Sequence, residues 1–247
     1  MQYQTRTRPS SLVAALAYVA ASPFFVAAQS PTVDDLVAKN IAAKGGLEKL
    51  HSVQSIKQTS HISMQSSTAT LVAYAKRPNM IRQEINIAGQ SVVQAFDGST
   101  AWTINPLQTG SNTPIVVTGP EADAMKEQAD FESPLVDYKV KGYKVEFIGA
   151  ETVAGKKLNH LKLTSKAQRV QHCYLDDATG LEVKIVSESP VGMLEQELSD
   201  YRDVNGVKVP FAIRTSSAGV TMASIAVDKV EINPTIDDAL FKMPAKK

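Results

Sequence analysis

The side chains best suited to metal binding or nucleophilic attack are few in this sequence and lie far apart along it. The histidines are His51, His61, His160 and His172, and the one cysteine is Cys173. No HExxH segment occurs, and no pair of cysteines or histidines has the spacing of a zinc site. We therefore expect neither a metal site nor another cofactor.

Three aspartate doublets are the clearest candidates for acid and base chemistry. They are Asp34-Asp35, Asp176-Asp177 and Asp237-Asp238. Each lies at an expected helix start or turn, where a carboxylate caps backbone amides or is solvated. The G-x-S-x-G, G-x-G-x-x-G and Walker loop patterns are also absent. We expect a protein that is not an enzyme, although an acid and base pair assembled from distant strands stays open because such sites are spatial.

The single cysteine also bears on the compartment. One cysteine excludes an internal disulfide, and in RVQHCYLD it falls on a strand-like alternation, so we expect Cys173 to be an inert, half-buried thiol. The sequence has no N-x-S/T sequon, since Asn112 lacks the pattern and Asn233 precedes a proline. This favours a bacterial periplasm over a eukaryotic secretory route.

The N-terminus has the three parts of an export signal. Arg6 and Arg8 precede an apolar run over residues 12–26, and small residues follow, with Ala28 just before the expected cut. We expect residues 1–28 to be a signal peptide and residues 29–247 to form a single periplasmic domain. No cysteine lies at the cleavage point, so a lipidated N-terminus is not expected.

Composition limits the partners of the mature chain. The full sequence of 247 residues is 43% hydrophobic, enough for a sizeable core, and carries a formal net charge of +1 before the two signal-peptide arginines are removed. No long run of lysine or arginine occurs, so phosphate-driven nucleic-acid binding is not expected.

The pattern of elements indicates an α+β fold. A capped helix is expected over 31–46, a short helical turn over 46–53, and a helical insertion over 119–138. The remaining segments alternate as strands separated by DG, DATG, DVNG and SSAG turns. About ten or eleven strands predict one strongly curved antiparallel sheet, a half-open β-barrel covered by the N-terminal helix and the helical insertion.

One face of this sheet could take an apolar ligand. In NMIRQEINIA, Ile81, Ile85 and Ile87 share a face that Gln83 interrupts, and the polar side chains share the other face. Filled by side chains, the concave face is a core, and incompletely filled it is a pocket. Trp102, the only tryptophan, suits either a core or a cavity wall.

The segment over 76–108 carries a resemblance to a known family. KRPNMIRQ, the strand QSVVQAF and DGSTAWTINPLQ resemble the signature of the periplasmic outer-membrane lipoprotein carriers (LolA and LolB-like), in which a KRPN turn joins two strands and a DG turn precedes a tryptophan strand ending in an NP turn. YLDDATGLEVKI and DYRDVNGVKVPFAI resemble the wider group of outer-membrane lipoprotein-sorting proteins.

This resemblance implies a half-barrel closed by a helical lid, whose cavity takes the acyl chains of lipoproteins. The cavity wall would include Ile81, Gln83, Ile85 and Trp102. Arg77 stands where the carrier's arginine hydrogen-bonds the lid backbone and holds the empty cavity closed. The carrier has a tryptophan where this chain has Gln83, so affinity or cargo would differ.

Three functions follow as expectations. The first is a monomeric periplasmic carrier or binder of lipoproteins or other acyl-chain ligands, with inner- and outer-membrane transport components as partners. The second is a lipid-sensing or protein-interaction module on the same fold. The third is a hydrolase, favoured only if the structure gathers a histidine and carboxylates in one cleft.

Overall fold

The computed structural model describes residues 1–2, 30–189 and 192–245. The expected signal peptide over residues 1–28 and its cleavage near Ala28 lie outside this range, apart from the first two residues. The chain divides into two compact units, residues 1–30 and 31–247, and the second holds every helix and strand given below. None of the helices described is long and apolar enough to span a membrane.

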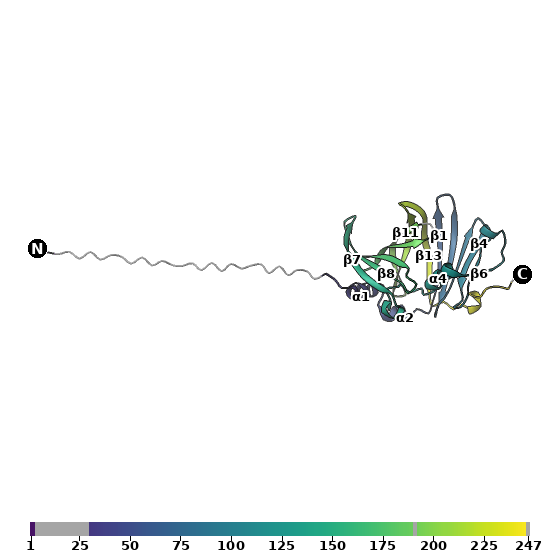
Figure 1. The fold of residues 1–247 in the computed structure, drawn as a ribbon, viewed down its shortest axis with the longest axis horizontal. Coiled ribbons are helices and arrows are strands. Elements are labelled where there is room, and N and C mark those ends of the chain that lie inside the picture. The colour runs from purple at the N-terminus through teal and green to yellow at the C-terminus, as the bar shows by residue number, and fades with distance from the viewer. Residues whose placement is uncertain (3–29, 190–191, 246–247) are drawn as a thin grey trace. The chain divides into compact units, whose positions relative to one another are not determined.

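A single antiparallel sheet of 13 strands forms the body of the second unit (Figure 1). Its order is β6-β5-β4-β3-β2-β1-β13-β12-β11-β10-β9-β8-β7, so only the step from β1 to β13 joins strands that are not consecutive. The strands are β1 Ser55–Met64, β2 Thr68–Lys76, β3 Met80–Ile87, β4 Gln90–Phe96, β5 Ala101–Ile104, β6 Ile115–Val117, β7 Lys144–Val153, β8 Lys156–Thr164, β9 Val170–Asp176, β10 Glu182–Ser189, β11 Gly192–Val204, β12 Val207–Ser217 and β13 Val220–Ile232.

The predicted α+β fold with an open, curved antiparallel sheet is confirmed, with 13 strands in place of ten or eleven. Among the described strands, β6 and β7 are the two edges and do not pair, so the sheet is not closed. The three-residue strand β6 is too short for its alternation to be read in the sequence, and it forms by pairing with β5.

The helix α1 (Val33–Ala43) covers part of one face of the sheet. Thr32 and Asp35 form the expected capping box, and Leu36 and Val37 are buried against leucines of β8 and β9. Gly45 then takes φ +122°, and a Cβ there would lie 2.1 Å from the carbonyl oxygen of Gly206. The glycine thus lets the end of α1 approach the β11–β12 turn closely.

The expected helical insertion is also present, as α4 (Gly119–Gln128) and α5 (Tyr138–Lys141), and we call residues 119–141 the lid segment. Met125 and Ala129 are buried against Phe96, Ala101 and Val117 of β4, β5 and β6. The lid segment and α1 with α2 (Leu47–Ser52) cover the same side of the sheet. We call that side the inner face. Figure 1 shows α4 between the two wings of the sheet, one of which ends at the edge strand β6 and the other at β7.

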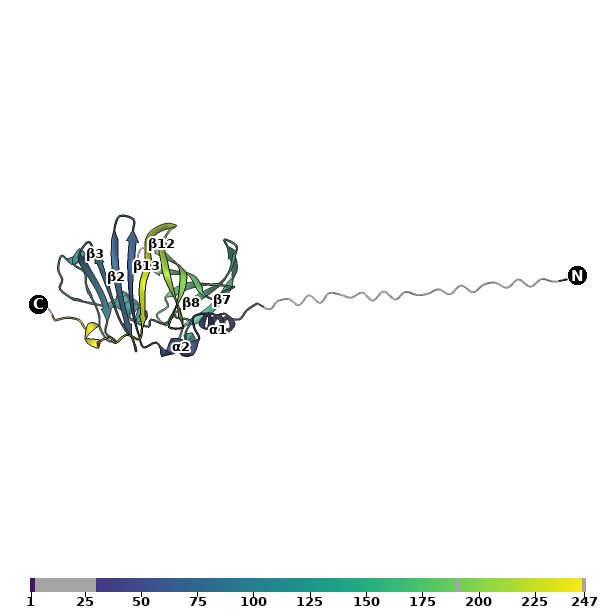
Figure 2. The ribbon, with the colours of Figure 1, turned by 180° about the vertical axis from the view of Figure 1, so that it is seen from behind.

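The outer face of β2 to β5 has a cover of its own. The C-terminal segment, which includes a 3-10 turn at Asp238–Leu240, runs along the lower ends of these strands in the view of Figure 2. Phe241 is completely buried with Met80 and Ile236, and Met243 packs against the cluster around Trp102. Three side chains donate to its backbone carbonyls, namely Lys76 to Ile236, Arg82 to Leu240, and Trp102 to Phe241.

Candidate ligand groove on the inner face

Strand register sets which side chains share the inner face. In one row across six strands, each residue lies opposite the next. All of its members except Ala75 belong to the hydrophobic clusters beneath the lid segment or α2. The row consists of Ile56, Ala75, Ile81, Phe96, Ala101 and Val117. Every second residue farther along each strand belongs to the same face, which extends the inner face beyond the helices.

Beyond the helices the inner face presents an apolar surface, which we call the apolar patch. Two further rows of the same register supply it, and none of its members belongs to the clusters buried beneath the helices. Leu71, Ile85, Ile87 and Val92 are only half-buried, whereas Ile62 and Ala69 are buried. The apolar patch consists of Ile62, Ala69, Leu71, Ile85, Ile87 and Val92.

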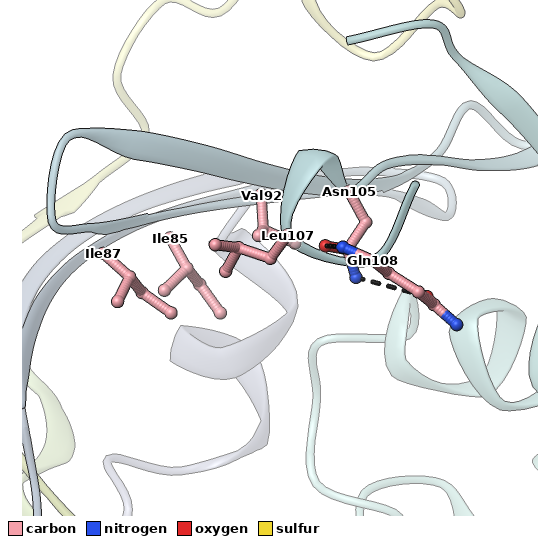
Figure 3. A pocket seen from close by; sticks show the side chains of 6 residues that line it. All are labelled: Ile85, Ile87, Val92, Asn105, Leu107 and Gln108. Atoms are coloured by element: carbon pink, nitrogen blue, oxygen red, sulfur yellow. Dashed lines mark hydrogen bonds between the residues drawn. The ribbon is translucent and has the colours of Figure 1, made fainter. Parts of the chain in front are cut away.

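A cavity of about 510 Å³ lies over one end of this patch. Ile85, Ile87 and Val92 form its floor, and Leu107 of the short helix α3 (Pro106–Thr109) projects toward the same space (Figure 3). Asn105 and Gln108 line its polar edge, where the Asn105 side chain accepts a hydrogen bond from the Gln108 backbone at 3.2 Å. The NP turn of the sequence therefore contributes an exposed leucine to the wall.

The charged side chains of the described strands β1 to β5 all lie away from the inner face. In β1 to β5, all of them described, no Asp, Glu, Lys or Arg occupies an inner position. Their charged side chains all lie on the outer face, as with Lys57, Lys76, Arg82 and Glu84. An uncharged, apolar surface open to solvent suits an apolar ligand and gives an ion no counter-charge.

The structure unites only part of the predicted cavity wall. Ile81, Gln83 and Ile85 lie on the inner face as expected, with Ile81 beneath α4 and Ile85 in the cavity. Trp102 does not share that surface, because it faces the opposite side of the sheet. There it is completely buried and donates from its indole Nε1 to the carbonyl oxygen of Phe241 at 2.8 Å.

The error over Trp102 has a local cause. Ala101 pairs with Phe96 and faces α4, so its neighbour Trp102 must face outward. The sequence offered no sign of the C-terminal segment that buries it. Sequence reasoning also missed Val92 and Leu107, although the alternation of QSVVQAF with its partner strand would have placed Val92 beside Ile85.

Arg77 contacts the lid segment through a side chain. Its guanidinium pairs with the carboxylate of Glu132, which is only 8% exposed, and lies 5.3 Å from the centre of the Phe131 ring. Its Nε donates to the carbonyl oxygen of Val53, at the end of α2, at 2.7 Å. Arg77 thus joins the lid segment to α2, whereas the family resemblance implied a bond to lid backbone.

A second arginine holds α4 from the other edge of the sheet. Arg169, in the turn between β8 and β9, donates from Nε to one carboxylate oxygen of Glu127 at 2.9 Å, and its Nη2 lies 2.6 Å from the other oxygen as an ion pair. This hydrogen-bonded pairing with Glu127 raises the pKa of the Arg169 guanidinium above its ordinary value. Because α4 also packs on β4 and β5, it spans the inner face from one wing to the other.

A smaller cavity of about 240 Å³ lies beneath residues 131–135 of the lid segment. Glu182 at its edge pairs with Lys44 at 3.3 Å and accepts from the Ser133 hydroxyl at 2.7 Å. Cys173 also lines it, and burial, together with the nearby Glu182, raises the pKa of that thiol well above its ordinary value. The thiol is buried rather than half-buried, as expected for an unreactive cysteine.

Two of the four histidines come together on the sheet. The ring nitrogens of His160 and His172 lie 2.7 Å apart, and His160 stacks on Tyr174 at a ring distance of 4.3 Å. Burial, followed by the nearby His172, lowers the pKa of His160. The described residues contain no group of three or more His, Cys, Asp or Glu side chains placed to hold a metal ion.

Known proteins resemble this chain in structure and not in sequence. No family model matches the sequence. No curated protein matches it either. A DUF1329 family protein from Desulfovibrio piger aligns over 86% of this chain and 98% of its own, with a TM-score of 0.59 and 13% identity.

Two further solved structures align as well. A LolA superfamily protein from Nitrosomonas europaea covers 86% of this chain and 98% of its own, with a TM-score of 0.57 and 12% identity. A domain named as an outer membrane lipoprotein-sorting protein, from Vibrio parahaemolyticus, covers 83% and 94%, with a TM-score of 0.56 and 11% identity. Over most of its length, therefore, this chain has a LolA-like fold.

Proposed function

We propose that this protein binds an acyl chain on the apolar patch of its inner face and carries it through the periplasm. The observation that carries the proposal is the combination of half-buried Leu71, Ile85, Ile87 and Val92 with the absence of charge from the inner positions of the described strands β1 to β5. Each methylene removed from water contributes about 0.8 kcal/mol. Binding of this kind requires no catalytic group.

The lid segment supplies a closing element for such a groove. It lies on the inner face and is held by Arg77 at α2 and by Arg169 at the β8–β9 turn. Both pairs are partly exposed and join different elements, so they can break without unfolding the sheet. We propose that Arg77 keeps the lid segment closed in the empty protein, and that Ile81 becomes part of the ligand wall when α4 moves.

The cellular setting is part of the proposal. On the basis of the export signal read from the sequence, we propose that the mature chain, residues 29–247, acts in the periplasm as one domain. The solved structures with this fold include a lipoprotein-sorting domain, which supports a lipoprotein or another acylated molecule as the cargo. Membrane components that load and unload the carrier would then be its protein partners, and the carrier itself would act as a monomer.

Native mass spectrometry of the protein lacking residues 1–28 tests the proposal. We expect a dodecanoylated peptide to bind saturably, and the Ile85→Asp variant to lose that binding because a carboxylate would stand on the apolar patch. The matched control is Thr70→Asp, which adds the same charge on the exposed outer face of β2.

Equal binding by Ile85→Asp, Thr70→Asp and the parent protein would place the acyl chain elsewhere. Failure of the folded parent protein to bind any acylated peptide would overturn the carrier function, and an interaction module would then be the better description. Circular dichroism of the three proteins ensures that a loss of binding is not a loss of fold.

A further inference from the structure

A row of amide side chains crosses the inner face between the helices and the apolar patch. Gln58 lies opposite Ala73, Ala73 opposite Gln83, Gln83 opposite Gln94, and Gln94 opposite Thr103. Because paired residues on one face lie side by side, these groups form a continuous line across five strands. We call Gln58, Gln83, Gln94 and Thr103 the glutamine row.

The two central glutamines have unused hydrogen-bonding capacity. Gln58 donates to Ser60 at 3.0 Å, and Thr103 donates to the carbonyl oxygen of Val93 at 2.9 Å. In the part of the chain that the structure describes, neither Gln83 nor Gln94 makes a side-chain hydrogen bond, although they lie directly opposite each other and are half-buried. Each amide offers two donors and one acceptor oxygen.

The surroundings of the row determine what it can bind. On one side lie Ile81 and Phe96 beneath α4, and on the other lie Ile85 and Val92 of the apolar patch. Successive rows on one face of a sheet are about 7 Å apart, so a polar group at the row leaves an attached chain over the patch. No inner position of the described strands β1 to β5 carries a charge that could neutralise an ionic head group.

We infer that Gln83 and Gln94 bind the uncharged polar group of an amphiphilic ligand, an ester, amide or hydroxyl, while its acyl chain lies on the apolar patch. The inference rests on the proposed acyl-binding function and specifies the chemistry of the ligand. A half-buried amide that a ligand covers is stabilised by a hydrogen-bonding partner on that ligand, whereas a carboxylate or ammonium group of a ligand at the same place would lose its hydration without gaining a counter-charge.

Two probes with the same acyl chain test this inference by isothermal titration calorimetry. They are 1-dodecanoylglycerol, which carries an ester and hydroxyl groups, and dodecanoate, which carries a charge. We expect the glyceride to bind at least about tenfold more tightly, because the carboxylate must stay hydrated outside the groove.

Substitutions in the glutamine row then test whether these side chains cause the preference for the glyceride over dodecanoate. Gln83→Met and Gln94→Met keep the side-chain length and remove the amide, so each should weaken glyceride binding about fivefold and change dodecanoate binding less than about twofold. Ser91→Met is the matched control, because Ser91 is exposed on the outer face of β4, and it should change neither affinity. A glyceride affinity unchanged in both glutamine variants would overturn the inference.

A second variant covers the case in which the methionines disturb the groove. Gln83→Glu keeps the shape of the side chain and adds a carboxylate, so it should raise the affinity for dodecylammonium about tenfold over the parent protein. An unchanged dodecylammonium affinity would place the polar end of the ligand away from the row. If the parent protein binds no probe at all, the acyl-binding function itself fails, and if it binds all probes equally, only the inference about the row fails.

Discussion

The inner faces of the two wings of the sheet are similarly hydrophobic, but they are covered to different extents. In the wing formed by β8 and β9, Leu161, Leu163 and Leu175 are almost completely buried beneath α1 and the lid segment. In the wing formed by β2, β3 and β4, Leu71 and Ile85 are half-buried, and neither belongs to the clusters beneath α1, α2 and the lid segment. The first is a closed core, and the second is a surface that lacks a partner.

The difference lies in the covering elements and not in the strands. Both wings alternate apolar and polar residues along each strand, which is the pattern of a sheet with one face in a core. A closed core stabilises the fold through its buried area, whereas the open wing has the same kind of surface still in contact with water. A ligand that covers this surface therefore gains the free energy of removing it from water.

The largest expected effect is on the stability of the covered wing. Leu161→Ala removes a completely buried side chain and should lower the free energy of unfolding by about 3 kcal/mol. Ile85→Ala in the open wing should lower it by less than about 1 kcal/mol, because its side chain is already partly in water. Urea denaturation of both variants measures the contrast, and equal losses would mean that the open wing is a core after all.

The next effect concerns the lid segment that separates the wings. Arg77→Gln leaves Glu132 paired, among the described residues, only with Lys141, which belongs to the lid segment itself, so the link from the lid segment to α2 is lost. The lid segment should then open more often and expose Cys173 beneath it. We expect the thiol to react with a maleimide about tenfold faster at neutral pH. The matched control, Arg202→Gln, breaks an exposed pair with Asp200 and should leave the rate unchanged. An unchanged rate in Arg77→Gln would remove its role in holding the lid segment.

A smaller effect is expected on ligand binding in the open wing. Ile85→Ala and Ile87→Ala each remove apolar area from the cavity floor, so each should weaken binding of 1-dodecanoylglycerol about fivefold while the fold is kept. Leu161→Ala should change this affinity little once the variant is shown to be folded. The opposite result, in which only Leu161→Ala weakens binding, would place the ligand in the covered wing.

The strands and helices of both wings could largely be predicted from the sequence, because alternation and capping are local signals. The strand QSVVQAF coincides with β4, and the helix expected over 31–46 is capped, by Thr32. The face of Ile81, Gln83 and Ile85 also followed from alternation. These features depend on residues that lie close together in the chain.

The remaining features depend on contacts between distant segments. Trp102 is buried on the outer face because the C-terminal segment covers it, with Phe241 lying 139 residues away in the sequence, and Arg77 meets Glu132 rather than lid backbone. The alignment of Gln58 with Gln83 and Gln94 needs the register of four strands, which no single strand reveals. Which wing is left open also depends on where the loops carry α1 and α4, and no local pattern encodes that position.

The smallest effect is a difference in the titration of thiols in the two wings. Burial raises the pKa of Cys173 above the ordinary value of 9.0, so the folded protein holds the proton after the unfolded chain has released it. The stabilisation is therefore complete below about pH 9 and declines as the pH rises from there toward the folded pKa. Between about pH 8 and pH 9.5 the parent protein should lose about 0.8 kcal/mol more unfolding free energy than Cys173→Val.

A thiol placed in the open wing provides the comparison. In the double variant Cys173→Val with Leu71→Cys, the thiol is half-exposed, so its folded and unfolded pKa values should nearly coincide and the additional pH dependence should vanish. Urea denaturation at the two pH values measures both differences. If the thiol at position 71 titrates as Cys173 does, the open wing excludes water even without a ligand, and the contrast between the wings would then be one of shape and not of hydration.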